Sequence, residues 1–391
     1  MELMDLRKKI DGIDDELLAL FEKRMGVIID VAAFKKSKNM PVLDRAREAE
    51  KLAAAAAKAS PEMQKYARIL FAMLINLGRK YQHENLFDAS APMYEYRSAL
   101  VRELREAKAK FAGKEFPTTT MIACQGVEGS FAELAAEKLF RQPTAIQYMK
   151  TYDSVFSAIE NGFCEYGVLP LENSTAGSVN KVYRAMQNHK FRIARSIRLK
   201  IDHHLVAPEG VSLDDIREVV SHEQALAQCD EFLSSLSKKH EIMQTQYNNT
   251  AAAAEMVATG TRRDVAAICS RRSADQYGLK ILQKNIQDNP NNFTRFICIS
   301  KNLEIYDGAN LTDMILTLKN EQGILHKVLS KINTLGIDLT KLESRPTESD
   351  EDFMFYVTFK TAVNDDLFAL LDELTELCKN FEFLGSYTEV L

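Results

Sequence analysis

Apolar residues recur at helical spacing through residues 3–38, and no proline interrupts them. This pattern predicts one long helix that Asn39 and Pro41 end. A second helix is expected from about Asp44 through the alanine-rich stretch. Ser60-Pro61-Glu62 has the order of an N-cap, a first helical position and an acidic first turn, which predicts a third helix. The first 83 residues are therefore expected to be entirely helical.

The pattern changes three times further along the chain. Residues 84–116 are rich in alternating Glu, Arg and Lys, which is typical of a helical linker. From Thr119 to about residue 300, short β-type runs alternate with amphipathic helices, which predicts α/β architecture. The last 80 residues have the order strand, helix, strand, strand, helix, strand, which is that of a ferredoxin-like unit. The predicted domains are 1–85, 86–117, 118–302 and 310–391.

Composition agrees with several globular domains in one chain. The 391 residues are 46% hydrophobic and 27% charged, enough to form separate cores. The net charge of −5 and the lack of a basic tract predict no nucleic-acid partner. Charged residues at the N-terminus and the absence of a long apolar run indicate neither a secretory signal nor a membrane span. We therefore expect a cytoplasmic enzyme.

Metal and cofactor chemistry find little support in the sequence. The six cysteines are far apart and form no C-x-x-C pair, which favours reduced core thiols. Neighbouring residues on a strand point to opposite faces, so His203-His204 does not predict a metal site. No G-x-G-x-x-G spacing occurs, so a nicotinamide or flavin is not expected either.

The first helix carries basic residues at informative distances. Arg24 and Lys35 lie on nearly the same face, about 16 Å apart, and their long side chains can converge on one ligand. Arg7 lies about 25 Å from Arg24 along the same helix, too far to share a small ligand with it within one chain. A helix of this length also needs a partner to cover it. An antiparallel dimer satisfies both requirements.

The head resembles the all-helical chorismate mutases from end to end. The matching residues are Leu6-Arg7-Lys8-Lys9-Ile10, Arg24, Lys35, Pro41-Val42-x-Asp44-x-x-Arg47-Glu48 and Gln82. The resemblance implies an intertwined dimer that binds the chorismate carboxylates through Arg24 and the partner's Arg7. It further implies that Arg47 builds the pocket, that Lys35 and Gln82 hydrogen-bond the ether oxygen, and that Asp44 and Glu48 receive the ring hydroxyl.

One position departs from that pattern. Gly78 stands inside the third helix where many relatives have a serine, and the loss of a hydroxyl can alter how substrate is held. Glycine also costs a helix interior about 1 kcal/mol. A four-helix dimerisation module without catalysis remains the alternative for the head.

Five motifs in the α/β region resemble the prephenate dehydratases in order and spacing. They are the turn at 126–130, Pro170 to Gly177, Ser221-His222-x-Gln224 with Gln228, Asn249 to Ala253, and Asn292 to Phe296. The resemblance implies two α/β lobes, similar to a periplasmic-binding-protein clamp, with substrate in the cleft. Thr294 matches the catalytic threonine, and Asn173, Ser221, Gln228, Thr250 and Arg295 match polar positions around the substrate. Without the neighbouring motifs, a buried capping threonine would be the preferred interpretation of Thr294.

Two segments of the tail resemble the regulatory ACT domains of phenylalanine-sensing dehydratases. They are Gly323-Ile324-Leu325 and, at a strand end, Leu342-Glu343-Ser344-Arg345-Pro346. The resemblance implies that Gly323, Ile324, Leu325, Glu343, Ser344, Arg345 and Pro346 bind phenylalanine across a dimer interface and thereby inhibit the enzyme. His326 departs from the apolar residue often found there. A purely structural ferredoxin-like tail is the alternative.

Together these features predict a multidomain enzyme of phenylalanine biosynthesis. It converts chorismate to prephenate and prephenate to phenylpyruvate, responds to L-phenylalanine, and needs neither metal nor organic cofactor. A homodimer or tetramer is expected. The alternative from another class is a non-catalytic sensor of aromatic metabolites.

Overall fold

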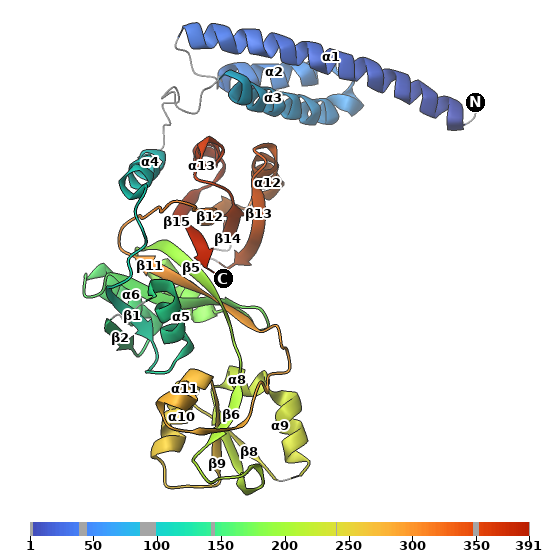
Figure 1. The fold of residues 1–391 in the computed structure, drawn as a ribbon. Coiled ribbons are helices and arrows are strands. Elements are labelled where there is room, and N and C mark those ends of the chain that lie inside the picture. The colour runs from blue at the N-terminus through green and yellow to red at the C-terminus, as the bar shows by residue number, and fades with distance from the viewer. Residues whose placement is uncertain are drawn as a thin grey trace. The chain divides into compact units, whose positions relative to one another are not determined.

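The computed structural model describes residues 3–38, 45–86, 99–141, 145–239, 241–346 and 352–390. The chain forms two compact units of helices and strands (Figure 1). The first comprises residues 1–101, 318–338 and 364–379, and the second comprises the remainder.

Three α-helices form the head. They are α1 (Leu3–Ser37), α2 (Arg45–Lys58) and α3 (Gln64–Leu86), so the predicted long first helix is confirmed. The predicted start of the third helix is wrong in detail. Pro61–Met63 is a 3₁₀ turn, and the Ser60 side chain accepts no capping hydrogen bond. A proline at the first position is compatible with this tight turn because the missing N–H has no intrahelical partner there.

Helix α4 (Ala99–Phe111) lies within the predicted charged linker. Leu104 is fully buried, and Lys108 Nζ donates to the Val363 carbonyl at 2.7 Å. The Phe111 ring lies 5.0 Å from that of Tyr306. The charge pattern therefore belongs to a helix with one solvated face and one face packed on the second unit.

The α/β region has two lobes, as predicted. In the first lobe, β11 (Phe293–Ser300) lies between β3 (Tyr166–Asn173) and β5 (Arg192–Lys200), antiparallel to both. Its other elements are β1 (Met121–Gln125), α5 (Phe131–Phe140), β2 (Ala145–Met149), α6 (Tyr152–Glu160), β4 (Gly177–Ser178) and α7 (Asn180–Asn188). Apolar side chains cover both faces of this sheet, which explains its nearly continuous hydrophobic strands.

The second lobe has its own five-stranded sheet, in the order β10-β6-β9-β7-β8. Its strands are β6 (His204–Ala207), β7 (Glu218–Ser221), β8 (Met243–Gln246), β9 (Val265–Cys269) and β10 (Lys280–Gln283). Its helices are α8 (Glu223–Ala227), α9 (Asp230–Ser237), α10 (Thr250–Thr259) and α11 (Arg271–Gln276), with a 3₁₀ turn at Leu213–Asp215. Separate hydrophobic clusters line the two faces of this sheet. All six cysteines of the chain are buried and unbridged.

The tail has the predicted βαββαβ order. Its elements are β12 (Leu311–Lys319), α12 (Ile324–Thr334), β13 (Asp338–Arg345), β14 (Asp352–Lys360), α13 (Asp365–Leu377) and β15 (Asn380–Val390). The strand order is β13-β14-β12-β15, and β15 also pairs in parallel with β5. The tail strands therefore continue the sheet of the first lobe, which the sequence pattern did not predict.

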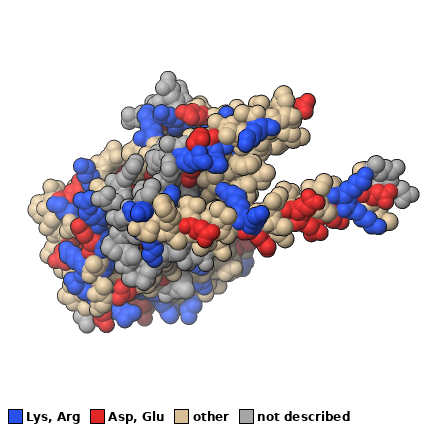
Figure 2. Space-filling view, turned by 90° about the horizontal axis from the view of Figure 1, so that it is seen from above, with Lys and Arg blue, Asp and Glu red and all other residues tan. Residues whose placement is uncertain are grey.

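Charge is dispersed over the surface. On the face drawn in Figure 2, basic and acidic side chains are interspersed among the described residues, without a broad field of one sign. No helix in the described part of the chain is both long enough and apolar enough to cross a membrane.

Candidate active sites and effector segments

A cluster of buried polar side chains occupies the end of the β3–β11 ladder. Thr294 and Asn173 are directly opposed across the two strands. Asn173 Nδ2 donates to Thr294 Oγ1 at 2.9 Å and to Asn292 Oδ1 at 2.7 Å. The predicted Asn173 and Thr294 are thus neighbours although 121 residues separate them in the chain.

The orientation of the Asn173 amide follows from its backbone contacts. Its Oδ1 accepts the backbone N–H groups of Thr175 and Ala176 at 3.0 and 2.8 Å. Only an oxygen can accept two amide donors, so the NH₂ group must point toward Thr294. The Thr294 oxygen is consequently an acceptor from Asn173, and its own proton stays available for another group.

Gln228 brings the second lobe to this cluster. Its Nε2 donates to Asn173 Oδ1 at 3.2 Å, and its Oε1 accepts from Asn292 Nδ2 at 3.0 Å. His203 Nε2 lies 3.0 Å from the same Oε1, which favours the tautomer with hydrogen on Nε2. Sequence reasoning assigned Gln228 to the site but gave no role to His203, because that residue stands in a pair of histidines whose metal interpretation had been rejected.

The Asn173–Thr294 cluster is electrically neutral. Burial lowers the pKa of His203, so its imidazole is uncharged near neutral pH. Asn173, Asn292 and Thr294 are also buried, at 5%, 1% and 9% exposure. Hydrogen bonds in such a setting are strong and directional because water does not compete for them. The cluster can therefore offer positioned, uncharged hydrogen-bond donors to an oxygen atom of a bound ligand.

Two other predicted substrate residues lie elsewhere in the second lobe. Ser221 ends β7, is fully buried, and donates from Oγ to the Ile268 carbonyl at 2.7 Å. Thr250 begins α10, whose N-cap Asn249 accepts the Ala252 N–H. Among the described residues, neither hydroxyl bonds to the Asn173–Thr294 pair.

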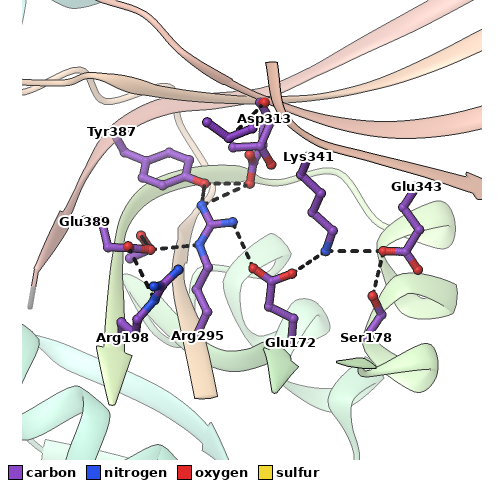
Figure 3. A network of polar contacts seen from close by, with 12 residues as sticks. Glu172, Ser178, Arg198, Arg295, Asp313, Lys341, Glu343, Tyr387 and Glu389 are labelled. Atoms are coloured by element: carbon purple, nitrogen blue, oxygen red, sulfur yellow. Dashed lines mark hydrogen bonds and ion pairs between the residues drawn. The ribbon is translucent and has the colours of Figure 1, made fainter. Parts of the chain in front are cut away.

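Arg295 contacts other partners than the Asn173–Thr294 cluster, and its predicted substrate role stays a prediction. Its guanidinium donates to the Tyr387 hydroxyl at 2.5 Å (Figure 3). It also lies 3.0 Å from Glu389 and 3.7 Å from Asp313, both on tail strands. Successive residues of a strand face opposite sides, so Thr294 and Arg295 cannot both face the Asn173 amide.

In the head, Arg24 is held against the third helix. Its Nη1 donates to the Leu74 carbonyl at 2.9 Å, and partial burial lowers its pKa. Gly78 leaves the space for this contact, because a Cβ there would lie 3.4 Å from Arg24 Nη1 and 2.6 Å from the end of Ile28. The glycine that departs from the mutase pattern is therefore a packing feature of α1 against α3.

The remaining mutase residues are placed as follows. Gln82 is 9% exposed on α3, and its Oε1 has no hydrogen-bond partner in the described part of the chain. Arg47 pairs with Glu50 at 2.7 Å on α2, which also carries Glu48. Arg7 and Lys35 lie on α1, and Asp44 is outside the described residues.

The two predicted effector segments belong to different units. Gly323 is the N-cap of α12 with a φ of 79°, a backbone conformation that favours glycine, and Ile324 and Leu325 follow in the first turn. His326 Nε2 lies 3.4 Å from the Ser330 hydroxyl.

The second effector segment contacts the first lobe. Glu343 and Arg345 end β13, with Ser344 between them and Pro346 after them. Glu343 accepts from the Ser178 hydroxyl at 2.6 Å, and Arg345 donates to Asn180 Oδ1 at 2.5 Å.

Comparison with known proteins agrees with these two kinds of site. The family model for chorismate mutase type II matches residues 6–83, and that for prephenate dehydratase matches residues 122–304. A bifunctional chorismate mutase/prephenate dehydratase of Pseudomonas aeruginosa is 30% identical over all of this chain and 98% of its own length. The chain belongs to the bifunctional chorismate mutase/prephenate dehydratase family.

Members of this family rearrange chorismate to prephenate and then decarboxylate and dehydrate prephenate to phenylpyruvate. An arogenate dehydratase/prephenate dehydratase of Arabidopsis thaliana is 35% identical over 68% of this chain and 72% of its own length. The structure of an Arthrobacter aurescens prephenate dehydratase in complex with L-Phe superposes with a TM-score of 0.62. It is 27% identical and covers 68% of this chain and 89% of its own.

Proposed function

We propose that Thr294 donates a hydrogen bond to the departing ring hydroxyl of prephenate and stabilises the hydroxide as the C–O bond breaks. The observation that carries this proposal is the fixed Asn173 amide, which engages the Thr294 oxygen as an acceptor and leaves its hydrogen free. Loss of carbon dioxide and hydroxide makes the ring aromatic, which drives the reaction. The enzyme must chiefly assist a poor leaving group, and positioned neutral donors are suited to that task.

Gln228 extends this role across the two lobes. Its bonds to Asn173 and Asn292 place Gln228, at the end of α8, beside the Asn173–Thr294 pair, where it can contact the same substrate. We assign prephenate as the substrate, although the Arabidopsis relative is also named for arogenate. The head of the same chain produces prephenate, which supports this choice.

For the head, we propose that Arg24, Lys35 and Gln82 bind chorismate together with the partner's Arg7. Asp44, Arg47 and Glu48 complete the pocket. The rearrangement is pericyclic and needs no nucleophile, only cationic and amide donors that stabilise charge on the ether oxygen. Because α1 is unbroken from Leu3 to Ser37, Arg7 stays about 25 Å from Arg24 of its own chain. A homodimer formed through the head supplies the missing cation.

Exposed apolar side chains support that dimer. Leu6, Ile13, Leu17, Val27 and Phe34 on α1 are each at least 44% exposed. Large apolar stripes of this kind mark interaction surfaces.

L-phenylalanine is the proposed effector, bound by Gly323, Ile324, Leu325, Glu343, Ser344, Arg345 and Pro346 of a tail of the ACT type. The L-Phe complex of the Arthrobacter relative supports this assignment. The Glu343 carboxylate is complementary in charge to the ammonium group of an amino acid, and the Arg345 guanidinium to its carboxylate.

Two substitutions test the division of labour. Thr294→Ala is expected to lower dehydratase kcat by about 10²-fold or more, as for loss of a hydrogen-bond donor to developing negative charge, and to leave the mutase unchanged. Arg7→Ala is expected to do the reverse. Chorismate and prephenate absorbance, followed separately in purified protein, measure both. A wild-type protein that turned over neither substrate would favour a non-catalytic sensor, and a folded variant that lost both activities would disprove separate sites.

A further inference from the structure

Strands β3 and β11 carry two cross-strand pairs next to each other. Thr294 opposes Asn173, and Arg295 opposes Glu172. Because side chains alternate between the faces of a strand, the first pair faces Gln228 and the second faces the tail strands. Any shift of the Glu172–Arg295 pair is therefore transmitted through two short backbone connections to the Asn173–Thr294 pair.

Arg295 contacts three residues of the tail, namely Tyr387, Asp313 and Glu389. Its Nη2 donates to the Tyr387 hydroxyl, which in turn donates to Asp313 Oδ2 at 2.5 Å (Figure 3). Its Nε lies 3.0 Å from Glu389 Oε1. Burial alone would lower the pKa of Arg295, but the surrounding acidic groups outweigh it and raise the pKa. The guanidinium is thus permanently charged and depends on its neighbours for compensation.

Glu172 continues the contacts toward the effector segment. It lies 3.5 Å from Arg295 Nη1 and also accepts from Lys341 Nζ. Lys341 in turn lies 3.2 Å from Glu343, which pairs with Arg345. Figure 3 shows Lys341 between the two carboxylates, one on the first lobe and one on β13. A continuous series of ion pairs therefore connects the predicted phenylalanine segment to the strand of Thr294.

We call Arg345, Glu343, Lys341, Glu172 and Arg295 the ionic chain. Cations and carboxylates alternate along it, and each inner member is shared between two partners. In a partly buried, low-dielectric setting, a shared group that loses one partner interacts more strongly with the other. The ionic chain is therefore able to transmit a change at one end to the other.

We propose that the ionic chain carries the phenylalanine signal to the dehydratase site, with Arg295 acting as a positioning residue for Thr294. This inference rests on the proposed function of Thr294 and of the effector segments. When the ammonium and carboxylate of phenylalanine engage Glu343 and Arg345, Lys341 keeps its hydrogen bond to the Tyr183 hydroxyl, and Glu172 becomes its one carboxylate partner among the described residues. Glu172 then moves away from Arg295, and Asn173 shifts against Thr294.

Lys341→Met tests the proposal because it cuts the ionic chain outside the effector segment. Arg295 still compensates Glu172, and Arg345 still compensates Glu343, so no carboxylate is left unpaired. Lys331→Met is the matched control. Lys331 pairs with Glu373 at 2.9 Å within the tail, its side chain is 23% exposed against 20% for Lys341, and it lies outside the ionic chain.

Dehydratase inhibition and phenylalanine binding are measured together, by prephenate turnover and by calorimetry on the full-length protein. Allosteric coupling is commonly about 5- to 150-fold. We expect Lys341→Met to bind phenylalanine but to be inhibited little at saturation. Lys341→Arg restores inhibition, and Lys331→Met behaves as wild type.

The other outcomes overturn the proposal in distinguishable ways. If phenylalanine inhibits Lys341→Met fully, the ionic chain does not carry the signal, and the effector assignment still stands. Loss of phenylalanine binding makes Lys341 an effector ligand and not a relay, and equal effects of both methionine variants indicate general loosening of the tail. A wild-type enzyme indifferent to phenylalanine removes the effector assignment and the relay with it.

Discussion

At the scale of single residues, the direction of one hydrogen bond decides what Thr294 can do. Asn173 gives a hydrogen to the Thr294 oxygen and thereby reserves the threonine proton for substrate. A carboxylate in the same place would accept that proton instead. The identity of Asn173 therefore matters as much as its position.

Asn173→Asp tests this polarity with almost no change in shape. The new carboxylate still accepts the Thr175 and Ala176 amides but captures the Thr294 hydroxyl. We expect dehydratase kcat to fall by about 10²-fold, with a smaller change in KM. Asn289→Asp is the control, because Asn289 bonds to Thr175 and not to Thr294. Similar losses in both variants would indicate an effect of added charge and contradict the polarity argument.

The sequence motifs predicted which residues lie near this site better than they predicted the strand face to which each side chain points. Asn173, Gln228 and Thr294 do meet, as expected from three separate motifs. Arg295 was assigned to substrate because it belongs to the same motif as Thr294, yet the two-residue period of a strand places it on the other face. Strand periodicity was the signal in the sequence that could have separated the two side chains, and the substrate role of Arg295 stays a prediction. The residues that pair with Arg295 lie on β12 and β15, far away in the sequence, so the motif could not predict them.

At the scale of elements, the parallel pairing of β15 with β5 joins the tail to the first lobe. The hydrophobic pattern predicted both strands but not their pairing, because it shows which residues are buried and not which strands lie side by side. Gly385 is the residue that permits this approach. A Cβ at that position would fall well inside contact distance of the Ile193 carbonyl oxygen.

Gly385→Ala is therefore expected to force β15 away from β5. A backbone carbonyl cannot move aside as easily as a side chain. The free energy of unfolding should therefore fall by at least about 1–3 kcal/mol, the loss that overpacking a core usually causes. Thermal or urea unfolding of the full-length protein measures the loss. Ser386→Ala, which removes the 2.7 Å bond to Thr312 but adds no atom, provides the comparison. A stability equal to wild type would show that this close approach is not kept in solution.

At the scale of the whole molecule, the chain joins two chemistries that need different partners. The Asn173–Thr294 cluster is complete within one chain, whereas α1 keeps Arg7 and Arg24 too far apart to share a ligand. The domain boundaries at 85, 117, 302 and 310 remain predictions, and the second unit begins within α4, at Arg102. The sequence pattern had no means of detecting that the tail strands and the first lobe share one sheet.

Subunit complementation tests whether the mutase site is built from two chains. Arg7→Ala and Arg24→Ala are each expected to be inactive as mutases. When both variants are coexpressed, half the dimers are mixed, and one of the two sites in each mixed dimer has both arginines. Mutase activity should therefore recover to about a quarter of wild type in a random mixture. Arg24→Ala coexpressed with Lys35→Ala is the control, because both residues are assigned to the same chain's contribution and no site is restored. Recovery in the control pair, or its absence in the first pair despite mixed dimers seen by mass spectrometry, would mean that the partner's Arg7 does not complete the site.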